Sequence, residues 1–94
     1  MGKPRIIKML DATTGHLPQD ICQDLNGYDG VIATDRTYGW LLWVPEDPAE
    51  HAGETGDVPA EVVALQVFAR GLGCDYVLLD RDADRVDGLP HWDW

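Results

Sequence analysis

The sequence lacks serine, has few cationic residues and contains no long apolar stretch. Without serine, and with neither cysteine in a nucleophile motif, we do not expect catalysis by an activated hydroxyl or thiol. The three histidines, His16, His51 and His91, show no metal-ligand spacing. No apolar stretch is long enough to cross a membrane and no signal peptide is evident, so we expect a cytoplasmic protein with no membrane partner.

Cysteine is also scarce. Cys22 and Cys74 both stand in apolar surroundings, which favours two buried free thiols in a reducing compartment over zinc ligands, with a single disulfide as the alternative. A glycine-rich phosphate loop is absent, because the glycines at 71 and 73 lead from a helix into a strand rather than the reverse. We therefore expect no cofactor.

Charge is the extreme feature of what is present. Seventeen acidic residues stand against seven basic ones, a formal net charge of −10. Direct binding to nucleic acid is not expected, because phosphate contacts need clusters of lysine and arginine. A small domain of this charge is either merely soluble or suited to a protein partner with a basic surface.

Apolar periodicity predicts a single domain, 1–94, with four strands and two helices. The strands are expected at 5–10, 31–34, 38–44 and 73–80, and the helices at 17–27 and 59–71. Residues 46–57 are acidic and rich in glycine and proline, which predicts an exposed loop. Residues 73–80 form a nearly continuous apolar run, which is typical of a strand buried on both faces.

This order, β-α-β-β-α-β, predicts an α+β fold of the ferredoxin-like type, a two-layer sandwich. Four mainly antiparallel strands would have the first and third in the middle, with two helices on one face. Strand 38–44 carries apolar side chains on both faces, so the second face also needs cover. The aromatic C-terminal tail, with Leu89, Trp92 and Trp94, is the expected lid, unless a partner subunit covers that face.

Four stretches resemble a family of short, acidic, uncharacterised bacterial proteins carried on plasmids, integrative elements and prophages. The stretches are 16–18 (HLP), 38–45 (YGWLLWVP), 73–84 (GCDYVLLDRDAD) and 92–94 (WDW). The resemblance spans nearly the whole chain and implies no activity or catalytic residue. It implies a setting among accessory genes of mobile elements, where small acidic proteins block host defence enzymes.

Two acidic stretches are the candidate partner-binding surface. Their carboxylates are those of Glu46, Asp47, Glu50, Glu54, Asp57, Asp80, Asp82, Asp84 and Asp87. The alternating aspartates of the second stretch resemble a calcium loop. However, the positions that need glycine and a bidentate glutamate hold Arg85 and His91, so we predict a solvated loop instead.

The leading hypothesis is a non-enzymatic protein-binding module, in its concrete form an inhibitor of a nucleic-acid-handling defence protein, of the anti-restriction or anti-CRISPR type. One alternative is a metal-dependent phosphodiesterase or nuclease that uses Asp11 as a ligand at the end of the first strand. The bland interpretation of Asp11 is a side chain that satisfies backbone donors in the following loop. The other alternative is a structural homo-oligomer, and both monomer and homodimer fit the sequence.

Overall fold

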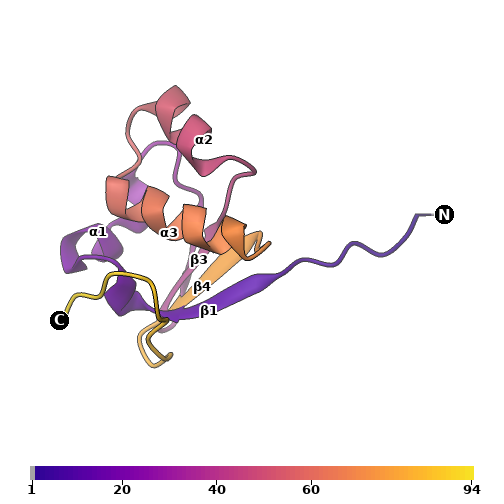
Figure 1. Cartoon of the computed structure of the whole chain (residues 1–94). Coiled ribbons are helices and arrows are strands. Elements are labelled where there is room, and N and C mark those ends of the chain that lie inside the picture. Colours follow the sequence, from indigo (N-terminus) through magenta and orange to yellow (C-terminus); the bar gives the residue numbers. More distant parts are fainter. Residues whose placement is uncertain (1) are drawn as a thin grey trace.

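The computed structural model describes residues 2–94 and shows a small α+β fold (Figure 1). The strands are β1 (Met9–Thr13), β2 (Ala33–Arg36), β3 (Gly39–Trp43) and β4 (Tyr76–Asp80). The α-helices are α1 (Gln19–Gln23), α2 (Pro48–Thr55) and α3 (Ala60–Gly71). Two 3₁₀ turns, η1 (Thr14–His16) and η2 (Leu25–Gly27), flank α1.

The sheet has the strand order β1-β4-β3-β2, so the predicted ferredoxin-like arrangement is wrong in its strand order. β3 is central, as expected, but its inner neighbour is β4 rather than β1. β4 pairs parallel with β1 and antiparallel with β3, and β2 forms a hairpin with β3. The coarser prediction, an α+β fold with helices and a four-stranded sheet, is confirmed.

Polarity explains why β4 rather than β1 lies inside the sheet. β4 reads Tyr-Val-Leu-Leu before its final aspartate, and a strand so apolar is stabilised by neighbours on both edges. β1 carries the exposed Asp11 and follows Lys8, and charged side chains are typical of edge strands. The run at 73–80 was predicted to be buried on both faces, and this is wrong: Val77 and Leu79 are buried, whereas Tyr76 and Leu78 on the other face are partly exposed.

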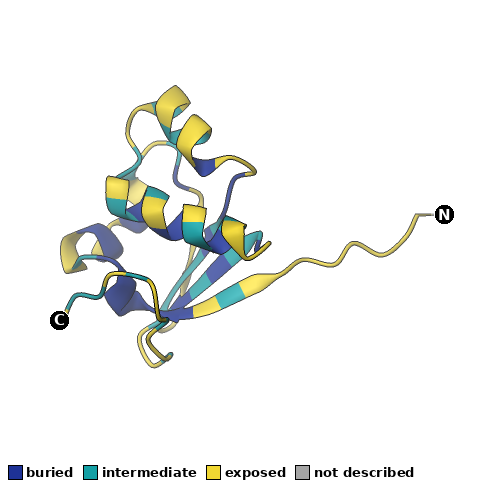
Figure 2. Ribbon diagram, viewed as in Figure 1, coloured by how far each residue is buried: buried dark blue, intermediate teal, exposed yellow. Residues whose placement is uncertain are grey.

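The core lies between the sheet and α3 (Figure 2). Val62, Leu65 and Ala69 of α3 are fully buried, as are Leu42 of β3 and Val77 of β4. A buried leucine or valine contributes about 1.5–3 kcal/mol relative to an exposed one, so this layer dominates the stability of the fold. β3 and β4 approach closely at Gly39, where any Cβ would collide with the carbonyl oxygen of Leu79.

Several predicted boundaries differ from the structure, and the helix expected at 17–27 is reduced to α1 followed by η2. Residues 46–57, expected as a loop, contain helix α2. Asp47 caps it by accepting the backbone N–H of Glu50 (3.2 Å), Pro48 occupies its first turn, and Gly56 ends it in the left-handed region (φ 72°). The first strand begins at Met9 instead of residue 5, because its partner β4 begins at Tyr76, opposite Met9. Residues 2–8 form an arm that extends away from the body (Figure 1).

The C-terminal tail packs back on the domain, but on a different surface from the one predicted. The buried ring of His16 donates from Nδ1 to the carbonyl oxygen of Pro90 (2.7 Å) and accepts the backbone N–H of Val86 at Nε2 (2.9 Å). Trp92 donates its backbone N–H to Gly15 (2.7 Å), and the Trp94 indole donates to the Leu17 carbonyl (2.9 Å). The tail therefore covers η1 and the adjoining part of α3, and the prediction of a lid on the second sheet face is wrong.

That second face stays uncovered in the monomer. The register places Met9, Tyr76 and Trp43 side by side on it, with Leu78 and Leu41 as the next pair. Beyond Trp43 lies Ile32, whose carbonyl accepts the Trp43 backbone N–H (2.9 Å). Met9 is 50% exposed and Ile32 59% exposed. We call this surface, Met9, Ile32, Leu41, Trp43, Tyr76 and Leu78, the open apolar face.

Candidate protein-binding groove

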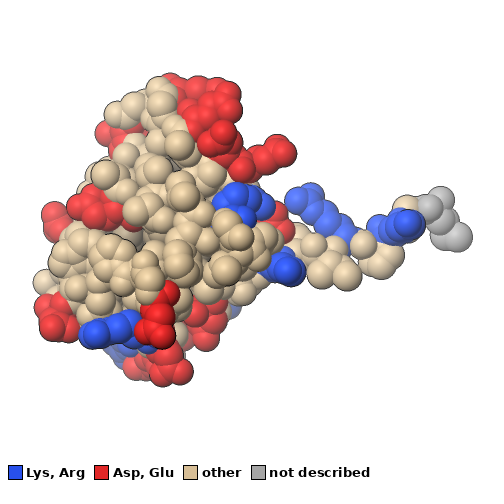
Figure 3. All heavy atoms as spheres, viewed as in Figure 1, with Lys and Arg blue, Asp and Glu red and all other residues tan. Residues whose placement is uncertain are grey.

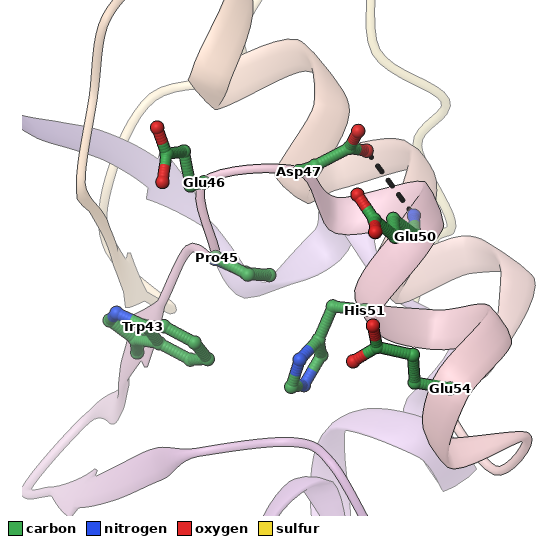
Figure 4. Close-up of a pocket in the computed structure, with 7 residues that line it drawn as sticks. All are labelled: Trp43, Pro45, Glu46, Asp47, Glu50, His51 and Glu54. Carbon is green, nitrogen blue, oxygen red and sulfur yellow. Dashed lines mark hydrogen bonds between the residues drawn. The ribbon is translucent and has the colours of Figure 1, made fainter.

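A groove of about 670 Å³ opens between the end of β3 and helix α2 (Figure 4). Trp43 and His51 lie toward each other across it, with ring centroids 5.4 Å apart in an edge-to-face arrangement. Its walls carry four carboxylates. The lining residues are Trp43, Pro45, Glu46, Asp47, Glu50, His51 and Glu54. We call this site the acidic groove.

The backbone that carries Trp43 into the groove is held from below by two side chains of α3. The Gln66 amide donates to the Trp43 carbonyl oxygen (3.2 Å). Arg70 donates to the carbonyl oxygens of Val44 (2.7 Å) and Pro45 (3.2 Å) and forms an ion pair with Asp75 (3.1 Å). The floor of the groove is therefore pre-organised, which lowers the entropic cost of ligand binding.

The opposite wall of the groove is formed by helix α2, and the acidic side chains on this helix destabilise it. Glu50 and Glu54 are spaced i, i+4, so their carboxylates repel by a few tenths of a kcal/mol. Glu54 also lies in the last turn of α2, where the helix dipole disfavours negative charge. The last turn of this helix, as the structure describes it, has no basic residue to offset that charge. The His51 ring, which lines the groove, also hydrogen-bonds through Nε2 to the Gly30 carbonyl oxygen (2.8 Å), which ties α2 to the loop before β2.

The groove is strongly negative. All four carboxylates belong to exposed residues, and within the part of the chain that the structure describes no lysine or arginine lines it. Two guanidinium groups lie in an adjoining hollow that shares Trp43 and Glu46 with the groove: that of Arg5, and that of Arg70, which is already engaged by Asp75 and two carbonyls. In Figure 3 acidic side chains gather over the α2 end and basic side chains lie along the N-terminal arm, while groups of both signs lie together at the lower edge of the view.

The structure groups four of the nine predicted partner-binding residues in this groove, namely Glu46, Asp47, Glu50 and Glu54. The fifth acidic residue of that stretch, Asp57, instead accepts the backbone N–H of Asp29 (2.9 Å) and fixes a loop.

The remaining four predicted residues, Asp80, Asp82, Asp84 and Asp87, lie at the other end of the sheet. Asp80 pairs with Gly39, whereas the groove begins after Trp43, which pairs with Tyr76. Asp80 also has a local role, since its carboxylate accepts the backbone N–H of Asp82 (2.8 Å). The two acidic stretches therefore form two separate surfaces, and the second is a turn at the opposite end from the groove.

Asp11, the ligand in the phosphodiesterase hypothesis, is exposed on edge strand β1. Over residues 2–94, no group of three or more His, Cys, Asp or Glu side chains is placed to hold a metal ion. Cys22 and Cys74 are buried free thiols, as predicted. Burial raises the pKa of the Cys22 thiol, which keeps it protonated and unreactive.

Sequence reasoning missed the contributions of Trp43 and His51 to the groove. Neither residue was among the predicted partner-binding residues, and His51 falls within residues 46–57, which were expected as an exposed loop. The available signal was the alternation of β3, which places Trp43 on the face opposite Leu42 and thus away from the core under α3.

No curated protein and no solved structure matches the chain. Among the described residues no helix is both long and apolar enough to span a membrane. A family profile does match, over residues 9–94, from the first residue of β1 to the end of the tail. The chain therefore belongs to the family of unknown function DUF5983 and corresponds to its C-terminal domain.

Proposed function

We propose that this protein is a non-enzymatic binding module that holds a basic segment of a protein partner in the acidic groove. The observation that carries the proposal is the combination of four carboxylates with an aromatic floor, Trp43, on a rigid base. Lysine and arginine side chains fit this site, because their cationic ends pair with carboxylates and stack on an indole face.

The charge of the whole domain supports the same function. A net charge of −10 attracts a basic partner over distances up to the Debye length, about 8 Å at physiological salt, and so accelerates association. The groove then supplies the specific contacts. Trp43 belongs both to the groove and to the open apolar face, so one ligand can contact carboxylates and apolar side chains together.

In its concrete form, we propose that the partner is a host defence protein that handles nucleic acid. Such proteins carry basic grooves for the phosphate backbone, and a row of carboxylates competes for the same lysines and arginines. The resemblance to proteins of plasmids, integrative elements and prophages motivates this version. No observation on residues 2–94 favours the phosphodiesterase alternative, since Asp11 has no converging ligands there.

Capture of partners from a host lysate on immobilised protein tests the proposal. We expect the captured protein to elute as salt rises from 0.05 to 1 M, because contacts of this kind are screened. A double variant, Glu50→Lys with Glu54→Lys, should lose the captured protein, and a nuclease-treated lysate should give the same capture. Capture that is independent of salt and of these two residues would contradict the proposal.

A further inference from the structure

The open apolar face requires an occupant, and the chain itself contains a segment of matching chemistry. The face presents six partly or largely exposed apolar side chains in adjoining rows of the sheet. Contiguous apolar surface of this kind marks an interaction site in a soluble protein. It is bordered by the acidic groove at one end, which shares Trp43 with it, and by Asp11 and Asp80 in the rows toward the other end.

The N-terminal arm, residues 2–8, has the complementary composition. It contains Lys3, Arg5 and Lys8, three of the seven basic residues of the chain, and no acidic residue. Between these cations lie Ile6 and Ile7, which are 85% and 47% exposed. The arm thus combines exposed apolar side chains with positive charge, and the face combines apolar side chains with a negative border.

Arg5 lines a hollow with Trp43 and Glu46 of its own molecule, at the edge of the acidic groove. The arm is nevertheless poorly suited to bring Ile6 and Ile7 onto the open apolar face of that molecule. Its base is fixed, because the Lys8 carbonyl accepts the backbone N–H of Asp75 (2.9 Å), and from there it extends away from the body (Figure 1). Folding back would need a tight reversal at Ile6 and Ile7, whose branched side chains favour extended backbone. Pro4 stiffens the next position in the same sense.

An extended arm of six free residues, 2–7, spans about 20 Å at 3.3 Å per residue, enough to cross from one molecule to a neighbour. On these grounds we infer that the occupant of the open apolar face is the N-terminal arm of a second copy. Ile6 and Ile7 pack on the face, and Lys3 and Arg5 pair with the carboxylates of the acidic groove. This inference rests on the proposed function, because the same groove receives the cations.

Reciprocal exchange gives a closed dimer. Each copy supplies one arm and one face, so two arms cross a two-fold axis and leave neither face free, whereas one-way docking would give open chains. Two bodies of net charge −10 repel each other, and this repulsion is screened within about 8 Å at physiological salt but reaches about 30 Å at 0.01 M. The dimer therefore forms best at moderate salt, and a groove occupied by an arm is closed to other partners.

Sedimentation equilibrium of the full chain at about 0.15 M salt tests the inference. The wild type should approach twice the chain mass of 10.4 kDa with rising concentration. An arm-reversed variant, Lys3→Glu with Arg5→Glu, and a groove-reversed variant, Glu50→Lys with Glu54→Lys, should each weaken dimerisation about tenfold or more. A matched control, Asp82→Lys with Asp87→Lys, changes the net charge as the groove reversal does, but at the other end of the sheet, and should still dimerise.

Mixing the two reversed variants separates exchange between copies from closure within one chain. In the mixture each arm meets a groove of opposite sign only in the other variant, so the heterodimer should form at lower concentration than either variant's own dimer. No heterodimer, or a wild type that stays monomeric, would overturn the inference. A monomeric wild type that still binds an unrelated basic peptide would leave the proposed function standing, whereas loss of both would overturn both.

Discussion

The hydrogen bonds of His16 attach the C-terminal tail to the domain, and their contribution to stability can be measured by replacing His16. His16 is 2% exposed, and its neutral ring joins two tail residues that are 70 or more positions away, the Val86 N–H and the Pro90 carbonyl. His16→Ala removes both partners at once. Each buried group left without a hydrogen bond costs about 1–3 kcal/mol, so we expect a loss of about 3 kcal/mol in the free energy of unfolding.

A loss of that size is a large share of the 5–15 kcal/mol typical of a small domain, and it corresponds to a fall of about 10–20 °C in Tm. Urea unfolding followed by circular dichroism measures the stability, and limited proteolysis with mass spectrometry measures release of the tail. The matched control is His51→Ala, which removes one hydrogen bond, to Gly30, and should leave the tail protected. A His16→Ala protein within 0.5 kcal/mol of the wild type, with its tail still protected, would refute this account of the tail.

Three further predictions concern the fold. Gly39→Ala should lower the free energy of unfolding by about 2 kcal/mol or more, because a Cβ would collide with the β4 backbone. Gly53→Ala in α2, where a Cβ meets open space, should raise it by about 0.5–1 kcal/mol. Equal effects of the two variants in thermal melts would contradict the close approach of β3 and β4. Because burial raises the pKa of Cys22, the neutral thiol stabilises the fold below about pH 9, and this contribution is lost as pH rises further. The difference in unfolding free energy between wild type and Cys22→Ala should therefore shrink above pH 9. A difference that stays constant with pH would contradict this effect of burial. Deletion of residues 89–94 should lower Tm strongly yet leave the oligomeric state unchanged, because the tail covers η1 and not the open apolar face; a new oligomer would restore the lid predicted from the sequence.

Patterns that depend on neighbouring residues were read correctly from the sequence. The stripe at 59–71 became α3, and the C-terminal part of the apolar run at 73–80 became strand β4. The alternation of β3 correctly predicted apolar side chains on both faces of the sheet. Each of these signals is local, since it follows from the period of a helix or a strand.

Features that depend on distant partners could not be predicted in the same way. The strand order depends on which edge of β4 receives β1, and composition alone leaves several orders open. The tail has aromatic residues that require burial, but its surface was set by the His16 ring, a single buried polar side chain 70 positions away. Helix α2 was hidden by its glycines and acidic residues, although Asp47-Pro48 is a helix-start signal that could have been recognised.

Only the acidic residues of the groove, and not their arrangement in space, could be predicted from the sequence. The carboxylates of Glu46, Asp47, Glu50 and Glu54 were identified from composition, but their convergence needed α2, and their separation from residues 80–87 needed the sheet register. The position of Trp43 in the groove could not be predicted either, because Gln66 and Arg70 of the distant helix α3 hold the end of β3 in place.

Titration of the 94-residue chain, diluted until it is monomeric, with a fluorescent peptide that alternates arginine and isoleucine tests the central claim most directly. The claim is that binding belongs to the acidic groove and not to net charge. At 0.15 M salt, Glu50→Lys with Glu54→Lys should weaken binding about tenfold or more, whereas Asp82→Lys with Asp87→Lys, of the same net charge, should weaken it less than about threefold. Equal weakening by the two double variants would show that charge alone attracts the peptide, and would contradict the account.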